Sequence, residues 1–397
     1  MTPPSPSTVD RYRDLHRHPE LAFEEIRTAG IAEAALRAAG YDVTAGIGGT
    51  GVVGVLRNGD GPTVLVRADM DGLPVTEDTG LEYASTVDGR MHACGHDVHV
   101  STLIGAAEQL AQGRADWSGT LVVLFQPAEE AGGGAQAMLD DGLYERVPVP
   151  DVVLGQHVGP APAGALGAHA GPAFAGASSL DVTVLGRGGH GSRPETTIDP
   201  IVLAAAIVMR LQTIVAREVS PQETAVVSIG RISAGTKNNI IPETASLGLT
   251  VRAFDEDVRS RVLLAIERIV RAEAAASGAP EPRIEYAESF PVLVNDVDAT
   301  ERTNAAFRAA FGDASVLDPG ALSGSEDVGL LATAAGAPLV YWILGGADAA
   351  SWFRAAEAGT LDRDVPSNHS PHFAPVLEPT LSRGVEALVT AARTWLD

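Results

Sequence analysis

Three short segments of the chain carry side chains that can bind a metal ion. They are His92-Ala93-Cys94-Gly95-His96-Asp97, Gln126-Pro127-Ala128-Glu129-Glu130 and Gly155-Gln156-His157. Cys, His and Glu drawn from separate loops bind borderline divalent ions, and a further carboxylate beside them can act as a base. We expect each segment to lie where a strand ends. The combination predicts a metal-dependent hydrolase.

Acidic residues or a histidine follow three of the expected strands: Asp69 and Asp71 after 63–67, Glu129 and Glu130 after 121–125, and His157 after 152–154. Open α/β sheets bind their ligands just beyond the carboxyl ends of the strands. A single histidine or aspartate at such a place is commonly a structural residue or a helix cap. Three coincidences together favour a common site.

Glu129 and Glu130 are neighbours and could simply be a solvated pair at a helix start, where the helix dipole favours negative charge. The wholly apolar strand before them and the three glycines after them instead suit a tight turn inside a pocket. Adjacent side chains diverge, so one carboxylate can bind a metal while the other faces the substrate as a base.

Two glycine-rich stretches match nucleotide-binding loops in letters only. Residues 46–51 fit the dinucleotide fingerprint, but residues 52–56 form a strand pattern where that motif needs a helix. Residues 186–191 lack the Gly-Lys-Ser/Thr ending of a phosphate loop. We therefore predict no nucleotide site at either stretch.

The composition fits a globular protein with two domains, because 397 residues are too many for one ordinary core and 45% of them are hydrophobic. The first ten residues lack the features of a signal peptide, and no run of about 18 uninterrupted apolar residues follows. We therefore expect a cytoplasmic protein. The single cysteine, Cys94, excludes an internal disulfide and leaves a buried residue, a reactive thiol or a metal ligand.

The net charge of -23, with no cluster of Lys and Arg, argues against nucleic acid and anionic membrane as partners. Any anionic substrate must be attracted locally, by metal ions or by individual arginines.

Helical and strand patterns alternate in the outer parts of the chain. We expect helices at 9–17, 22–39, 98–112 and from about 134, and strands at 52–56, 63–67, 120–125, 152–154 and 339–344. This alternation predicts an α/β fold with a parallel or mixed sheet covered by helices.

The middle of the chain has a different order of elements. Strand 180–185, helix 198–219, strands 225–231 and 245–254, helix 257–276 and strand 283–289 give the order βαββαβ. This is a ferredoxin-like layout, which can form a separate α+β domain. We therefore expect residues 178–290 to be an insertion into a discontinuous metal-binding catalytic domain made of residues 1–177 and 291–397.

Five segments, in this order, resemble a known family: Arg67–Pro74, Met91–Asp97, Pro127–Glu130, Gly188–Gly191 and His369–Phe373. They look like the dinuclear metallo-amidohydrolases that include bacterial aminoacylases, hippurate hydrolases and auxin-amino-acid conjugate hydrolases, relatives of the zinc exopeptidases. The likeness runs from about Leu15 to the C-terminal region. It implies an α/β/α catalytic domain of the zinc-exopeptidase type with an inserted lid.

The resemblance implies a centre of two divalent transition-metal ions, which could be zinc, manganese, cobalt or nickel. The implied ligands are Cys94, His96, Glu130, His157 and His369. Glu129 would be the general acid/base, and Asp71 would orient a histidine ligand. From the sequence alone His372 would serve equally well, and we prefer His369 because it stands first in the His-Ser-Pro-x-Phe pattern.

In the family that the chain resembles, the inserted domain acts as a lid and forms dimers. The resemblance implies that His190 stabilises the oxyanion, often in the site of a partner subunit, and that Asn239 and Arg252 contact a substrate carboxylate. An arginine fork suits a carboxylate, although an exposed arginine on a strand is commonly a plain surface residue. The implied partners are a small-molecule N-acyl amino acid and further copies of the chain, in a homodimer or a dimer-based oligomer.

The predicted reaction is hydrolysis of the amide bond of an N-acyl amino acid, which releases a carboxylic acid and a free amino acid. A dipeptidase or carboxypeptidase with the same centre is the alternative. A cysteine-nucleophile hydrolase using Cys94 and His96 is a rival, but residues two apart on a tight turn rarely align, and inhibition by a chelator would exclude it. An inactive binding module is a second rival, and the intact Glu129 argues against it.

Overall fold

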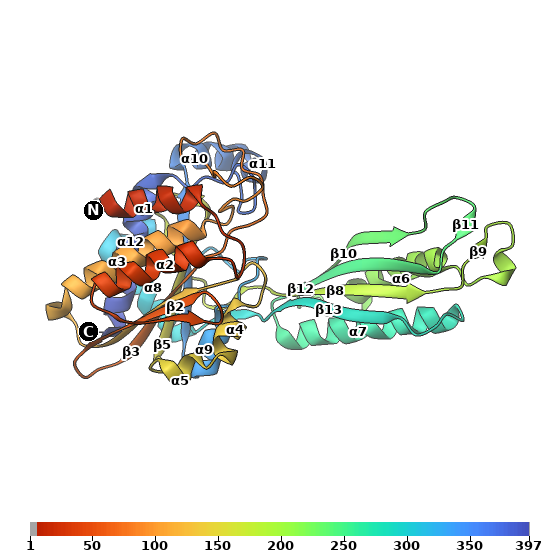
Figure 1. Ribbon diagram of the computed structural model, residues 1–397, viewed down its shortest axis with the longest axis horizontal. Coiled ribbons are helices and arrows are strands. Elements are labelled where there is room, and N and C mark those ends of the chain that lie inside the picture. The colour runs from red at the N-terminus through yellow and green to blue at the C-terminus, as the bar shows by residue number, and fades with distance from the viewer. Residues whose placement is uncertain (1–5, 397) are drawn as a thin grey trace. The chain divides into compact units, whose positions relative to one another are not determined.

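The computed structural model describes residues 6–396, which divide into two compact units (Figure 1). Of the described residues, unit 1 contains those up to Gly171, Val294–Gly320 and those from Asp327 onward, and unit 2 contains Pro172–Leu293 and Ala321–Glu326. The sequence did not predict that 321–326 returns to unit 2. Leu322 pairs there with the backbone of Ala173 and Ala175, which explains the return.

Unit 1 is built on a seven-stranded mixed sheet in the order β1-β2-β4-β3-β5-β15-β6. The strands are β1 Asp42–Ile47, β2 Gly51–Asn58, β3 Thr63–Asp69, β4 Gly119–Gln126, β5 Val152–Pro162, β6 Leu166–Gly167 and β15 Leu339–Ala347. The four strands β4, β3, β5 and β15 run parallel, and the outer strands pair antiparallel. The carboxyl ends of the parallel strands therefore lie at one edge, where the sequence placed its candidate residues.

Helices cover this sheet in unit 1 (Figure 1). They are α1 Pro6–Arg17, α2 Ile26–Ala38, α3 His96–Gln112, α4 Gly134–Asp140, α5 Leu143–Arg146, α8 Val297–Phe311, α9 Gly329–Ala335, α10 Ala349–Ala358, α11 Leu361–Asp364 and α12 Leu377–Leu396. The inner strands bury nearly every side chain, as apolar strands covered on both faces do. The predicted α/β fold with a mixed sheet is confirmed. Two smaller strands, β7 Gly171–Phe174 and β14 Leu293–Asn295, pair with each other.

Residues 46–51 form the turn of an antiparallel hairpin between β1 and β2. A strand therefore follows the glycines, and the geometry of a dinucleotide-binding loop, which needs a helix there, is not formed.

Unit 2 is a two-layer α+β unit. Its strands β8 Gly176–Leu185, β10 Ala225–Ala234, β12 Thr244–Ala253 and β13 Arg283–Phe290 form an antiparallel sheet in the order β10-β12-β8-β13. Helices α6 Pro200–Arg217 and α7 Glu256–Ala276 contact each other and the same strands. This is the predicted ferredoxin-like order, and a short pair, β9 Gly189–His190 with β11 Ile240–Ile241, extends from it.

Helix α6 is long and apolar enough to cross a membrane, with a mean hydropathy of 1.6 over 18 residues. Its buried side chains, however, lie on one face at helical spacing, at Leu203, Ile207, Leu211 and Ile214, and pack into the core of unit 2. Arg210 interrupts the apolar sequence on the exposed side. The helix therefore has the pattern of a packed helix of a globular unit.

Candidate metal centre

The segment that carries Cys94 and His96 lies at the start of a helix, so the expectation that it follows a strand end is wrong. Gly95 is the N-cap of α3 with a φ of 83°, and His96 is the first residue of the helix. A Cβ at Gly95 would lie 2.4 Å from a methyl group of Val158, so the left-handed turn requires glycine. The turn holds Cys94 and His96 buried next to each other.

His157 lies inside β5, which continues to Pro162, so the expectation of a strand that ends before it is also wrong. The Nδ1 atom of His157 donates a hydrogen bond to the carbonyl oxygen of Val158 at 2.8 Å. Its Nε2 atom then faces Cys94 Sγ at 3.5 Å. Burial lowers the pKa of His157 to about 3, so the ring is in the neutral form that binds metals.

Two buried carboxylates hold the backbone of the segment that presents Glu129 and Glu130. Asp71 accepts the N–H of Glu129 at 3.1 Å and that of Glu130 at 2.9 Å, and Glu25 accepts the N–H of Ala128 at 2.8 Å. Ala128 has a positive φ of 48°, which is uncommon for a residue with a side chain and needs such support. No sequence pattern indicated Glu25, whose bond to Ala128 spans about a quarter of the chain.

Asp71 lies beside His96, one of the histidines that the resemblance implies as ligands. The distance from His96 Nδ1 to Asp71 Oδ1 is 3.3 Å, and His96 Nε2 faces the carboxylates of Glu130 and Glu129 at 3.8 and 4.0 Å. This Nε2 atom is fully buried and has no hydrogen-bond partner among the described residues. Burial lowers the pKa of His96, but Asp69 and the other carboxylates raise it by more, so the net pKa is about 10. The pocket therefore favours a cation at this nitrogen, which a metal ion would provide.

His369, and not His372, approaches the other candidate residues. Its Nε2 atom lies 3.2 Å from Glu130 Oε1, and its N–H donates to the carbonyl of Ala93 at 2.8 Å. The His372 ring is instead bonded to the backbone oxygen of Asp78 at 2.6 Å. Burial raises the pKa of Glu130, but the bond to His369 and the charge of His96 lower it to a net value below its usual range, so Glu130 is ionised.

Two sets of possible ligand atoms share the sulfur of Cys94. One set is Cys94, His96 and His157, and the other is Cys94, Glu130 and His369; within each set the atoms lie within 4.8 Å of one another. Sulfur, imidazole nitrogen and carboxylate oxygen together suit borderline divalent ions. The donor atoms and the buried Nε2 of His96, which has no hydrogen-bond partner among the described residues, thus fit a metal centre.

A third set of buried residues, Asp69 with His96 and His99, shares His96 with the first set. Both nitrogens of His99 are already bonded: Nδ1 to Asp69, and Nε2 to the N–H of Val158 at 2.8 Å. His99 therefore has no lone pair left for a metal. It instead fixes the backbone directly after His157, a role that was not predicted from the sequence.

Cys94 is not activated as a nucleophile in this structure. Burial and the carboxylates of Glu130 and Glu129 raise the pKa of its thiol well above the usual value. Reactive cysteines lie in electropositive surroundings that lower the pKa. The thiol is a better metal ligand, because a bound cation removes its proton.

The three candidate residues of unit 2 fall at two places. His190 in β9 pairs with Ile240, and Asn239 accepts the N–H of Gly191 at 2.9 Å, so His190 and Asn239 lie close together. Asn239 lies shortly before the start of β12, whereas Arg252 lies at the end of this strand. Arg252 donates to Ser323 O at 2.8 Å and to Ser325 Oγ at 2.9 Å. Within one unit 2, Asn239 and Arg252 therefore do not form one carboxylate site.

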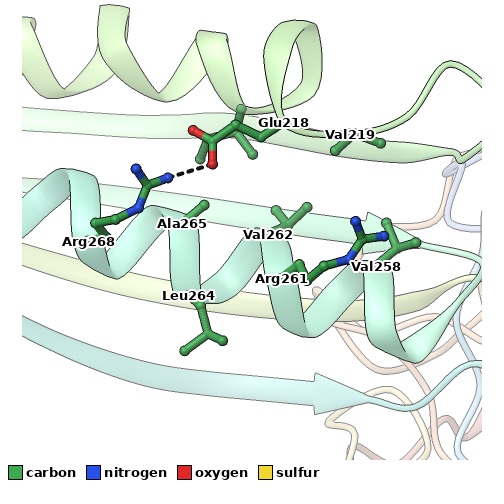
Figure 2. Close-up of a pocket in the computed structure, with 9 residues that line it drawn as sticks. Glu218, Val219, Val258, Arg261, Val262, Leu264, Ala265 and Arg268 are labelled. Carbon is green, nitrogen blue, oxygen red and sulfur yellow. Dashed lines mark hydrogen bonds and ion pairs between the residues drawn. The ribbon is translucent and has the colours of Figure 1, made fainter.

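Unit 2 also contains a pocket of about 370 Å³ between the end of α6 and helix α7 (Figure 2). Its floor is aliphatic, and its arginines Arg261 and Arg268 form ion pairs with Glu223 and Glu218. Among residues 6–396, those that line it include no histidine or cysteine, so it offers no imidazole or thiolate ligand for a transition metal.

Comparison with known proteins places this centre in a family. The model of peptidase family M20/M25/M40 matches residues 65–393. The chain belongs to this family. It is 41% identical over 318 residues to hippurate hydrolase of Campylobacter jejuni, and the match covers 79% of this chain and 82% of that protein. It is 38% identical over 339 residues to thermostable carboxypeptidase 1 of Saccharolobus solfataricus, covering 84% of each.

A solved structure agrees with the family assignment. The crystal structure of the Bacillus subtilis YXEP protein, described as a dinuclear metal-binding peptidase of the M20 family, matches with a TM-score of 0.77. The two chains are 30% identical, and the match covers 98% of each. The family resemblance and the class of metal-dependent amidohydrolase that the sequence predicted are confirmed.

Proposed function

We propose that the enzyme hydrolyses the amide bond of N-acyl amino acids at a centre of two divalent transition-metal ions. The observation that carries the proposal is the pair of ligand sets that share Cys94, with Glu129 beside them. The similarity to a hippurate hydrolase supports an N-acyl amino acid as substrate.

In the proposed centre Cys94, His96 and His157 would hold one ion, and Cys94, Glu130 and His369 would hold the other. Zinc, manganese, cobalt and nickel all accept this mixture of donors. When bound, such ions would act as Lewis acids toward the substrate carbonyl and would lower the pKa of a water molecule.

Glu129 is the general base of the proposed mechanism. The backbone N–H of Glu129 donates to Asp71. The carboxylate of Glu129 lies 4.0 Å from His96 Nε2, so Glu129 is next to the proposed ligands His96 and Glu130. Glu129 takes a proton from the attacking water and returns it to the leaving nitrogen, which departs as the free amino acid. Asp71 keeps both His96 and the Glu129 segment in place during these transfers.

His190 is the proposed donor to the oxyanion that develops on the acyl carbonyl. It is exposed on β9, and its Nδ1 atom is bonded to Ser192, which leaves Nε2 as the atom to face a substrate. Asn239 next to it and Arg252 at the other end of β12 are the proposed contacts for the substrate carboxylate. Because these two residues lie apart within one unit 2, we propose that they reach one site from different subunits.

The surface of unit 2 supports a homodimer. Strand β10 is an edge strand of its sheet and exposes Val226 (49%) and Ile232 (56%). Helix α6 exposes Val202 (65%) and Met209 (72%). An open strand edge with exposed apolar side chains is a common place for pairing with a second chain. Light scattering should show a dimer that Met209→Lys weakens.

A substrate panel tests the proposed activity. The purified enzyme should hydrolyse acetyl, benzoyl, longer-chain acyl or indoleacetyl conjugates of amino acids faster than unblocked dipeptides. Glu129→Gln is the matched control, because it keeps the ligands and removes the base. Preferential cleavage of free dipeptides or of C-terminal residues from peptides would instead favour the dipeptidase or carboxypeptidase alternative. We also propose a cytoplasmic location, which cell fractionation would test.

A further inference from the structure

One side-chain amide contacts two of the ligand-bearing segments at once. The Nδ2 atom of Asn368 donates to the carbonyl oxygens of Cys94 at 3.1 Å and of Val158 at 3.0 Å, and it lies 3.7 Å from Cys94 Sγ. The next residue, His369, donates its backbone N–H to Ala93 at 2.8 Å. Residues 368 and 369 thereby connect the turn before α3 to strand β5.

The carbonyl of Val158 is shared between Asn368 and the metal-binding candidate His157. It accepts from His157 Nδ1 at 2.8 Å as well as from the amide, and a carbonyl oxygen has two lone pairs for this. The bond at Nδ1 leaves the Nε2 atom of His157 free to face Cys94. By fixing this carbonyl, Asn368 also fixes the orientation and tautomer of His157.

The backbone of His369 depends on the same contacts. Its φ of 69° lies in the left-handed region, which a residue with a side chain adopts only when its surroundings hold it there. The amide of Asn368 and the bond from the His369 N–H to Ala93 anchor the chain before this φ angle, and the N–H of Ser370, which donates to Ser367 O at 3.1 Å, anchors it after. The same contacts that join the segments therefore also aim His369.

We propose that Asn368 is a positioning residue of the metal centre. Its amide sets the mutual placement of Cys94, His157 and His369, because its two N–H groups bond the carbonyl oxygens of Cys94 and Val158. Groups that bond to metal ligands in this way orient them and tune the metal. The inference rests on the proposed assignment of these three residues as ligands.

Cobalt(II) binding tests this role without any measurement of activity. Metal-free protein is titrated with cobalt(II), and the near-ultraviolet charge-transfer band from sulfur to cobalt reports the bond to Cys94. Asn368→Ala should weaken cobalt binding by about 10–100-fold and shift the band. Asn368→Asp, which keeps the size but offers no N–H donor, should do the same and serves if the alanine variant does not fold.

Asn304→Ala is the matched control. Asn304 is buried, whereas Asn368 is half-buried, but like Asn368 it bonds backbone, with its amide donating to Ala168 O at 3.0 Å; it lies on α8, away from the candidate ligands. Its variant should lose thermal stability while cobalt affinity and the band stay as in the wild type.

Three outcomes would contradict the assignments. Unchanged cobalt affinity and an unchanged band in folded Asn368 variants would overturn the positioning role. Failure of both Asn368 variants to fold, with a folded Asn304→Ala control, would also overturn it, because Asn368 would then serve the fold itself. A wild-type cobalt protein that lacks the sulfur band would contradict the proposed ligand role of Cys94, which separates failure of the proposed function from failure of this inference.

Discussion

Asp71→Asn is a sharp test of how the fold supports the metal centre, because this one carboxylate serves two segments. It accepts the N–H groups of Glu129 and Glu130 and lies 3.3 Å from His96 Nδ1. Asparagine has nearly the same shape but only one acceptor oxygen. In either orientation its NH2 group must therefore face a backbone N–H, that of Glu130 or that of Glu129 beside His96 Nδ1, and at least one contact becomes repulsive.

The expected magnitude follows from the loss of one charge-assisted bond. Hydrogen bonds to charged groups contribute about 1.5–3 kcal/mol and neutral ones about 0.5–1.5 kcal/mol, so the substitution costs roughly 2 kcal/mol of organisation in the centre. A difference of about 1.4 kcal/mol is tenfold in affinity, which gives a loss of roughly 30-fold for zinc. This lies within the roughly 10–100-fold range usual for groups that orient metal ligands.

The assay is competition for zinc between the metal-free protein and a chromogenic chelator. Asp199→Asn is the matched control, because Asp199 also accepts two backbone N–H groups, at 2.8 and 3.4 Å, but as the half-buried N-cap of α6 in unit 2. Asparagine caps helices as well as aspartate does, so zinc affinity and stability should both stay unchanged. Wild-type zinc affinity in Asp71→Asn would refute the argument that this carboxylate organises the centre.

Three further predictions concern the base, the lid and the pH range. Glu129→Gln should keep its metal while kcat falls by roughly 10²–10⁴-fold, whereas Glu130→Gln should lose metal; equal metal loss in both would contradict these roles. His190→Ala should keep its metal and lower kcat more than it raises KM, and normal turnover would contradict the oxyanion role. Burial lowers the pKa of His16, but Asp97 raises it more, to about 10 from 6.5. The stability from this pair is therefore complete below pH 6.5 and is lost as pH rises through about 10, and thermal unfolding of His16→Gln should lack that alkaline loss.

Much of the fold could be predicted because local patterns determine it. The apolar strand before Glu129 and the amphipathic spacing of α6 and α7 are visible within a few residues, and the observed elements lie at or near the predicted places. The end of β5 could not be predicted in the same way. Its glycine and proline residues after His157 read as a loop, but pairing with the parallel strand β15 extends it to Pro162.

The candidate site was predicted at the level of ligand types and order, since reactive side chains stand out in a sequence. The contacts that hold these side chains in place could not be predicted, because they join residues far apart in the chain. Glu25 bonds Ala128 across 103 positions, and Asn368 bonds Cys94 across 274. No local spacing reveals such pairs. His369 was preferred to His372 only on the family pattern, and its distance of 3.2 Å to Glu130 supports that preference.

The most direct test of the two-ion centre is the metal content of the protein in relation to its activity. Metal-free enzyme should regain activity on an N-acyl amino acid as zinc, manganese, cobalt or nickel is added, with elemental analysis showing up to two ions per chain. Because both ligand sets share the sulfur of Cys94, Cys94→Ala should lose affinity at both positions and nearly all activity. A metal-free enzyme with full activity, or a Cys94→Ala variant with wild-type metal content and turnover, would contradict the centre.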